Sequence, residues 1–214
     1  NGRSLFVLHL ALSAPPHYRA AAGNAPVDLA FSQEMFGGRV EDQVRAYRDI
    51  ATGVPPRMEM LQVTLPTLFD PSQAPAGRHT AVVWQYAPYR IEPDGPEGWR
   101  RLRDEYAEHV LGLWSSYAPN ITKDVILGMR IQDPTDTERH NDNLVNGVDV
   151  VGDMTPDQMG WFRPFAGWSD YRTPVEGLYM CGGYCHPGGG VHAGAGHNAA
   201  GVIADDYQLN RWWD

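Results

Sequence analysis

A glycine-rich run close to the C-terminus, Cys181–Ala200, constrains the fold more than any other feature of the sequence. Seven of the fifteen residues from 182 to 196 are glycine. Glycine lets main-chain N–H groups approach a bulky ligand closely, and it permits a positive φ where the chain bends. Ordering so much glycine is entropically costly unless something rigidifies the loop. We therefore predict a cofactor cradle that leads from a strand over 177–183 into a helix over 197–209.

The opening of that helix favours an anionic ligand. Gly194, Ala195 and Gly196 keep it free of bulky side chains. The first N–H groups of a helix lack intrahelical acceptors and carry about half a positive charge. Such an end suits a pyrophosphate or the phosphate arm of a flavin, so FAD is the cofactor we expect. The alternative without a ligand is a glycine loop that packs tightly against another backbone.

The helix opening also matches a well-known fingerprint, since Gly194–Ala199 fits G-x-G-x-x-A. That dinucleotide fingerprint needs a strand directly before it and a second strand, ending in Asp or Glu, about 20 residues later. No second strand follows before Asp214. We therefore expect an accessory cradle that completes a site built mainly elsewhere.

Upstream of the glycine run, strands and helices mix without strict alternation. The predicted strands are 4–12, 27–33, 58–64, 79–87 and 125–131, and the predicted helices are 40–51 and 97–118. Residues 133–152 are predicted to form a polar, irregular loop, which at this length is functional or makes contacts, and Thr155 and Pro156 are predicted to start a short helix. This pattern favours the α+β class, with helices flanking a mixed sheet.

Composition and charge exclude several function classes. The net charge is −9 and no stretch is rich in Lys or Arg, which argues against nucleic acid as a partner and against an electrostatic membrane anchor. No run of 18 apolar residues predicts a transmembrane span, and no signal peptide is visible. We expect a cytoplasmic location, with peripheral contact to a membrane left open. The chain lacks an initiator Met, and we expect it to be part of a longer protein or one component of a complex.

Cysteine and histidine residues inside the glycine run offer an alternative chemistry. Cys181, Cys185 and His186 form C-x-x-x-C-H, one residue longer than the usual attachment site of c-type haem. Together with His192 and His197 they could surround zinc. The simpler interpretation is two reduced thiols with no bound metal.

Candidates for contact with a substrate come from the aromatic residues. Trp84, Tyr86 and Trp168 could line an apolar tunnel for a small organic substrate, although aromatic residues also fill ordinary cores. Beside a flavin, His186 would orient the substrate or stabilise the negative charge of the reduced cofactor, and we treat it as the candidate catalytic residue.

The stretch Glu176–Ala200, EGLYMCGGYCHPGGGVHAGAGHNAA, resembles the C-terminal FAD signature of phytoene desaturase-like FAD-dependent oxidoreductases. This family, within the amine oxidase superfamily, includes carotenoid desaturases and retinol saturase. Asp70–Thr80, Thr155–Met159 and Ser169–Pro174 also resemble stretches of the family that precede a substrate-domain strand or the signature itself.

The resemblance implies a domain organisation and a set of cofactor contacts. In the family, the N-terminal segment and the extreme C-terminus build the FAD domain, so 1–175 would be a substrate domain and 176–214 the C-terminal FAD-binding segment. The N-terminal dinucleotide-binding half would then be a separate chain or a missing segment. The implied FAD-binding residues are Cys181, Gly182, Gly183, Pro187, Gly188, Gly189, Gly190, Val191, Gly194, Gly196 and Asn198.

The function implied is that of a desaturase or dehydrogenase component, which removes hydride from an apolar or amine-type substrate. Without the N-terminal half we expect it to be inactive. Two alternatives stay open: a non-catalytic interaction domain or subunit with a vestigial flavin loop, and the haem or zinc site described above.

Overall fold

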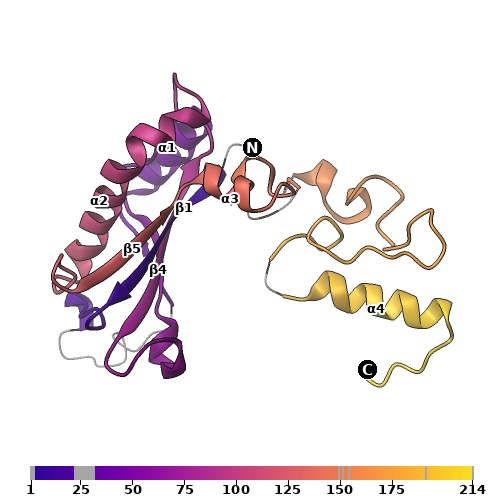
Figure 1. Cartoon of the computed structure of the whole chain (residues 1–214). Helices are drawn as coiled ribbons and strands as arrows, with labels where there is room; N and C mark the ends of the chain where they lie inside the picture. The colour runs from indigo at the N-terminus through magenta and orange to yellow at the C-terminus, as the bar shows by residue number, and fades with distance from the viewer. Residues whose placement is uncertain are drawn as a thin grey trace. The chain divides into compact units, whose positions relative to one another are not determined.

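The computed structural model describes residues 3–21, 32–148, 150, 152–153, 155–190 and 192–213. The chain divides into two compact units (Figure 1). The first unit comprises Asn1–Asp142 and Asn146–Val148, and the second comprises Asn143–Val145 and Asp149–Asp214. The functional division between 1–175 and 176–214 stays a prediction.

The first unit is built on a five-stranded sheet. Its strands are β1 (Arg3–Leu12), β2 (Ser32–Phe36), β3 (Met60–Thr64), β4 (His79–Pro88) and β5 (Ile126–Gln132). They lie in the order β2-β3-β4-β1-β5, and each recorded pairing is antiparallel. The α+β class is therefore confirmed, but the expectation of a mixed sheet is wrong, because neighbouring strands run in opposite directions and no parallel crossover joins them. The strand predicted at 27–33 begins at Ser32 in the structure, and residues 22–31 lie outside the described residues.

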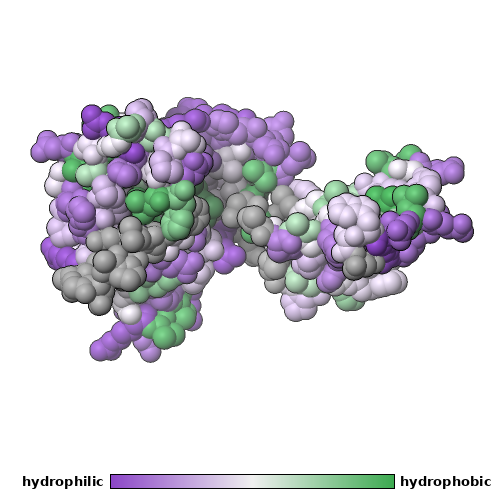
Figure 2. Space-filling model, turned by 90° about the horizontal axis from the view of Figure 1, so that it is seen from below, coloured by the Kyte–Doolittle hydropathy of each residue, from purple (hydrophilic) through white to green (hydrophobic). Residues whose placement is uncertain are grey.

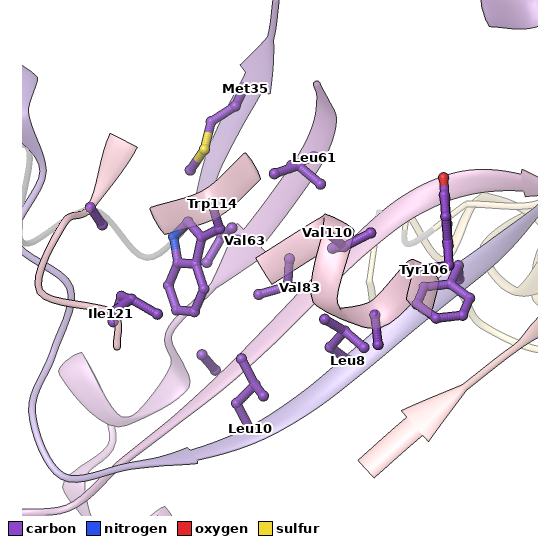
Figure 3. Packing of buried hydrophobic residues seen from close by; sticks show 14 of the residues in the cluster. Leu8, Leu10, Met35, Leu61, Val63, Val83, Tyr106, Val110, Trp114 and Ile121 are labelled. Carbon is purple, nitrogen blue, oxygen red and sulfur yellow. The ribbon is translucent and has the colours of Figure 1, made fainter. Parts of the chain in front are cut away.

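The long helix α2 (Trp99–Tyr117) covers one face of this sheet (Figure 1). A short 3₁₀ turn, η5 (Pro96–Gly98), precedes it. Because side chains alternate along a strand, the even-numbered residues of β1 and the odd-numbered residues of β4 point to this face, and all of them except the half-buried His79 are buried. The core between sheet and helix includes Leu8, Leu10, Met35, Leu61, Val63, Val83, Tyr106, Val110, Trp114 and Ile121 (Figure 3).

The opposite side of the sheet, here termed the open face, carries the alternate residues of the same strands. Its central side chains are Val7 and His9 of β1 and Val82, Trp84 and Tyr86 of β4. Helix α1 (Val40–Ala51) reaches one end of the open face, where the ring of Tyr47 lies 6.2 Å from that of Tyr86. The helix has the predicted bounds. Its buried residues, however, are Ala46 and Ile50, while Val40 at the start of its apolar stripe is 76% exposed.

Helix α3 (Pro134–His140) occupies a stretch that the sequence predicts to be irregular. The carboxylate of Asp133 accepts hydrogen bonds from the N–H groups of Thr135 (2.9 Å) and Asp136 (3.3 Å), and Asp136 accepts from the N–H of Asp133 (3.2 Å). This reciprocal cap, with Pro134 in the first turn, starts a helix despite the polar sequence. The expectation of an irregular 133–152 is therefore wrong for these residues.

Further 3₁₀ turns connect these elements. They are η1 (Arg19–Ala21), η3 (Pro66–Leu68), η4 (Pro71–Gln73) and η6 (Val145–Gly147) in the chain up to the end of the first unit. In the second unit, η7 (Pro156–Gln158) follows Thr155 as expected, and η8 (Gly160–Phe162) comes next. Among the described residues, no helix combines the length and apolar character needed to cross a membrane.

The second unit contains α4 (Gly194–Asp206) and, in its described residues, no strand at 177–183. A single bridge joins Arg172 to Tyr179 instead, with hydrogen bonds from Thr173 N to Leu178 O (3.2 Å) and from Met180 N to Tyr171 O (2.9 Å). The predicted strand is wrong because this segment folds back on residues just before it and pairs with no sheet. The predicted cradle is thus a loop followed by a helix.

The core of the second unit is small. It consists of Tyr171, Cys185, Ala195 and Ala199, with Val202 packed against it. Many apolar side chains stay exposed, and Figure 2 shows green patches on this unit. The exposed large apolar side chains of the second unit include Trp161, Phe165, Val175, Leu178, Met180, Leu209 and Trp212.

Candidate cofactor site

The glycine run borders a hollow of about 270 Å³ in the second unit. Eight of the eleven predicted cofactor-binding residues line it: Cys181, Gly182, Gly183, Gly188, Gly189, Gly190, Gly194 and Gly196. The turn after Cys181 and the first turn of α4 thus face the same space. Glycines from two separate stretches, predicted together from the sequence, meet here.

Two of these glycines are not required by the packing of the chain itself. A Cβ added at Gly182 or at Gly196 would meet no atom within 4 Å, apart from immediate neighbours and, at Gly196, the backbone of α4. Neither residue has the positive φ that favours glycine. Their missing side chains therefore leave room that a ligand can use.

Other glycines in the run serve the fold. Gly188 and Gly190 have φ of 116° and 137°, which side chains rarely tolerate. A Cβ on Gly194 would lie 2.8 Å from Nδ1 of His192, and one on Gly189 would lie 2.9 Å from Val150. Some glycines of the run are therefore required by the backbone or its packing, whereas Gly182 and Gly196 leave open space along the hollow.

The first turn of α4 presents main-chain donors to the hollow. Nδ1 of His192 accepts from the N–H of Gly194 (2.9 Å), and Ala193 O accepts from the N–H of His197 (3.0 Å). The N–H groups of Ala195 and Gly196 belong to the first turn, where a helix supplies no acceptor of its own. Both residues line the hollow, so this end can receive a negatively charged group.

Three predicted cofactor residues do not line the hollow. Pro187 and Asn198 lie outside its lining, and Val191 lies outside the described residues. Asn198 Nδ2 donates to the hydroxyl of Tyr171 (2.8 Å), and that hydroxyl donates to the carbonyl of His186 (2.8 Å). Asn198 therefore ties α4 to the loop that carries His186.

The candidate catalytic residue His186 also lies outside the lining of the hollow. Its Nδ1 atom is buried and has no hydrogen-bond partner in the structure. A buried polar atom without a partner is uncommon, and it marks a position where a ligand or another segment can bind.

Arg163 is a residue that the sequence reasoning missed. Its side chain is 1% exposed and donates to the carbonyls of Gly183 (2.7 and 3.2 Å), Asp153 (3.1 Å) and Gln158 (3.1 Å). It thereby anchors the start of the glycine run to the segment before it. A lone arginine in Phe162–Pro164 gives no periodic or motif signal that would reveal this role.

Other missed residues line the hollow directly. They are Leu144, His192 and Ala193, and Ala195, which the sequence places in the helix opening, lines the hollow beside them. Leu144 comes from the stretch 133–152, whose length alone predicted a functional loop, and the sequence pattern suggested His192 only as a metal ligand. Nothing in the spacing linked Leu144 to the glycine run.

The two cysteines have different surroundings. Cys181 is exposed and borders the hollow, whereas Cys185 is 2% exposed and packs in the small core of the second unit. Burial raises the pKa of the Cys185 thiol, and the neighbouring Cys181 raises it further. Within the part of the chain that the structure describes, no three His, Cys, Asp or Glu side chains gather closely enough to hold a metal ion.

The predicted substrate-binding residues fall in both units. Trp84 and Tyr86 lie on the open face of the first unit, half-buried, with their rings 5.5 Å apart. Trp168 lies in the second unit, where its ring is 5.4 Å from Phe165. A second hollow, of about 530 Å³, adjoins the open face and is lined in part by His9, Thr80, Val82 and Arg130.

Known proteins that resemble this chain are oxidoreductases by name. No family model matches the chain. It is 36% identical to "Pyridine nucleotide-disulfide oxidoreductase domain-containing protein 2" of Rattus norvegicus, over 93% of this chain and 35% of that protein. It is 30% identical to a limonene dehydrogenase subunit of Castellaniella defragrans, over 98% of this chain and 38% of that protein. The relatives support an FAD-type oxidoreductase family.

A further relative is weaker. Phytoene desaturase (neurosporene-forming) of Rhodobacter capsulatus is 29% identical over 68% of this chain and 27% of that protein. The relatives therefore support the resemblance at the level of oxidoreductases and do not single out phytoene desaturases. The chain spans about a third of the length of the relatives it matches, between 27% and 38%.

Proposed function

We propose that this chain is the C-terminal part of an FAD-dependent dehydrogenase or desaturase that removes hydride from a C–H bond of an organic substrate. The observation that carries the proposal is the hollow beside Gly182 and Gly196, two glycines that the chain's own packing does not require. The names of the relatives, an oxidoreductase-domain protein and a dehydrogenase subunit among them, support the reaction class.

The donors and glycines around the hollow support contact with part of a flavin dinucleotide. Main-chain N–H groups of Ala195 and Gly196 would hold its phosphate oxygens, and Gly182, Gly183 and the 188–190 stretch would lie along the rest of the molecule. FAD, when bound, supplies the hydride acceptor. Cys181 would border it, while Pro187, Val191 and Asn198 would shape the loop that holds it.

His186 keeps its proposed role as the catalytic residue. Its carbonyl is held by Tyr171, which in turn is held by Asn198, so the backbone beside its ring is fixed. The unpartnered Nδ1 could donate to or accept from a bound group, and this would orient a substrate or stabilise negative charge.

The partner in this proposal is an N-terminal FAD-binding half, in the same polypeptide or as a separate chain. The chain spans only 35% of its relative from Rattus norvegicus, which leaves room for such a half there. The exposed apolar side chains of Val175, Leu178 and Met180 would be covered by it. Trp84 and Tyr86 in the first unit and Trp168 in the second keep their proposed role in binding an apolar substrate, since aromatic side chains suit such a molecule.

A test uses the full-length protein, which here means this chain together with its proposed N-terminal half. The wild type is compared with two matched leucine variants. Gly196→Leu places a side chain in the hollow from helix α4. The control, Gly112→Leu, adds the same side chain to helix α2, away from the hollow. A Cβ at Gly112 also meets nothing within 4 Å. The visible absorption of each purified protein reports bound flavin.

We expect a flavin spectrum in the wild type and in the Gly112→Leu control, and at least a tenfold loss of flavin affinity in Gly196→Leu, the scale of losing a few hydrogen bonds to a charged group. A full-length wild type without flavin would refute the proposal. A colourless but stable complex with the N-terminal half would favour the interaction-domain alternative, and a haem spectrum the metal alternative.

A further inference from the structure

One end of the open face carries three basic side chains. His9 of β1 lies directly opposite Arg130 of β5 in the antiparallel register, so their side chains share a face. The guanidinium of Arg130 donates to Nε2 of His140 on α3 over 3.2 Å. His9, Arg130 and His140 are called the basic cluster below.

No carboxylate in the described part of the chain forms an ion pair with the basic cluster. The nearby acids of α3 are engaged elsewhere. Asp136 pairs with Arg103 (3.1 Å) and Arg139 (3.0 Å), and Glu138 accepts a hydrogen bond from Tyr89. Arg130 is thus a cation without an acidic partner among the described residues, and His9 beside it bonds the neutral side chain of Gln132 at 3.2 Å, so this place suits an anionic ligand.

The basic cluster adjoins a space large enough for such a ligand. His9 and Arg130 line the hollow of about 530 Å³ together with Thr80 and Val82, and no Asp or Glu of the described residues lines it. Arg130 is exposed, so its guanidinium can reach a molecule that enters from solvent. Its planar fork matches a carboxylate in two parallel hydrogen bonds.

Apolar side chains also line the hollow, and they include Ala11, Pro66 and Val82. Val82 stands opposite His9 in the row of the basic cluster, and Thr80 stands opposite Ala11 one row further along. Trp84 and Tyr86 lie in the other direction along the open face and do not line the hollow, and the guanidinium of Arg3 lies 4.8 Å from the ring of Tyr86.

We propose that the hollow on the open face binds an amphipathic organic acid, with its carboxylate on Arg130 and His9 and its apolar body against Ala11, Pro66 and Val82. This inference rests on the proposed function and names its substrate class: an apolar molecule that ends in a carboxylate. A wholly apolar substrate would have no use for the basic cluster, and the cluster would cost it desolvation.

The experiment measures binding rather than turnover. Decanoate and decan-1-ol share an apolar chain and differ in charge, and their dissociation constants for the full-length protein are measured by calorimetry. Two variants are compared with the wild type: Arg130→Gln and the control Arg100→Gln, which removes an exposed arginine of α2 outside the open face.

We expect decanoate to bind at least tenfold more tightly than decan-1-ol. Arg130→Gln should weaken decanoate binding by about 10- to 100-fold, the effect of losing hydrogen bonds to a charged group, and leave decan-1-ol unchanged. Arg100→Gln should change the binding of neither ligand. Because Arg130 is exposed, its variant should keep the fold, which circular dichroism checks.

Three results would overturn the inference: no binding of decanoate, equal binding of acid and alcohol, or an unchanged decanoate constant in Arg130→Gln. The flavin spectrum of the same samples separates this outcome from failure of the proposed function. If the protein shows a flavin spectrum but binds decanoate no more tightly than decan-1-ol, only the proposed substrate class is refuted. If it prefers decanoate but shows no flavin spectrum, only the proposed redox function is refuted.

Discussion

At the scale of single residues, this protein depends on a few buried polar side chains that hold loops in place. Tyr106 donates to the carbonyl of Pro56 (2.8 Å) and accepts from Nε2 of Gln85 (2.7 Å), which fixes the loop before β3. Arg163 does the same for the glycine run through Gly183. Each such group stabilises the fold mainly because its loss leaves partners buried without hydrogen bonds.

Replacement of Arg163 by Met should destabilise the protein by about 2–4 kcal/mol, because several buried carbonyls would lose their donor. Urea denaturation followed by tryptophan fluorescence measures the change in free energy of unfolding. The matched control is Arg100→Met, at a side chain that is 81% exposed and should change stability by less than about 0.5 kcal/mol. Equal effects of the two variants would contradict the anchoring role of Arg163.

The ionisation of Tyr89 offers a test by pH. Burial, followed by the hydrogen bond to Glu138, raises the pKa of Tyr89 to about 12 from an ordinary value of 10.0. Because the folded pKa is the higher one, Tyr89 contributes stability below about pH 10 that is lost as the pH rises toward 12.

Glu138→Gln should lower the pKa of Tyr89 only part of the way, since burial remains the larger cause. An NMR titration of ¹³C-labelled tyrosine, with Tyr89→Phe to assign the signal, measures this pKa. A wild-type pKa near 10 would show that neither the burial of Tyr89 nor its hydrogen bond to Glu138 persists in solution.

At the scale of elements, a helix cap can start a helix where the sequence has no apolar periodicity. Asp133 is 2% exposed, caps α3 and pairs with Arg103 at 3.2 Å. It therefore joins the start of α3 to the middle of α2. The helix exists although its residues offer little apolar surface.

Asp133→Ala should destabilise the first unit by about 1–3 kcal/mol, because both the cap and the partner of Arg103 are lost. Asp133→Asn keeps an oxygen that can cap the helix and should therefore cost less. Free energies of unfolding from chemical denaturation compare the two variants. A neutral Asp133→Ala, or an Asn variant as unstable as the Ala variant, would show that the cap contributes little.

Elements with strong periodicity could be predicted from the sequence, and those fixed by local polar contacts could not. Helix α1 has the predicted bounds, and α2 and the strands β1 and β4 lie within a few residues of theirs. In contrast, α3 depends on the Asp133 cap, a signal that is present in the sequence but is hidden by its polar surroundings. The apolar run at 177–183 indicated a strand, yet a strand needs a neighbour, and its spacing does not say whether one exists.

In the candidate site, the residues of the glycine run could be predicted from the sequence, and the residues that reach it from other segments could not. Glycines contiguous in sequence could be assigned to one wall because a turn followed by a helix keeps them together. Leu144 and Arg163 could not be, since their proximity to the run arises from the path of the chain through the second unit. On the open face, the pairing of His9 with Arg130 depends on the register between β1 and β5, which no local pattern specifies.

At the scale of the whole molecule, the two units differ in how well they fill their interiors. The first unit has a continuous core of some twenty buried residues, whereas the buried core of the second has Tyr171, Cys185, Ala195 and Ala199. A small core buries little apolar surface, so the second unit should depend more on a partner for its stability.

Hydrogen–deuterium exchange should reveal this difference. In the 214-residue chain alone, amides of β1 and β4 should exchange more slowly than those of α4, because local opening is easiest where few apolar contacts are made. In the full-length protein, α4 should gain protection while β1 changes little. Equal protection of α4 in both proteins would argue against an N-terminal half that covers the second unit.

Because Cys181 is exposed and Cys185 is buried, the two thiols should react differently with an alkylating reagent. Alkylation requires the thiolate, so the raised pKa and burial of Cys185 should keep it unmodified at neutral pH while Cys181 reacts. Because Cys181 borders the hollow, any molecule seated there should shield it, and mass spectrometry after a brief iodoacetamide pulse would read occupancy without reference to colour or turnover. Alkylation of Cys181 thus reports whether the hollow is occupied, and the buried Cys185 serves as the internal control.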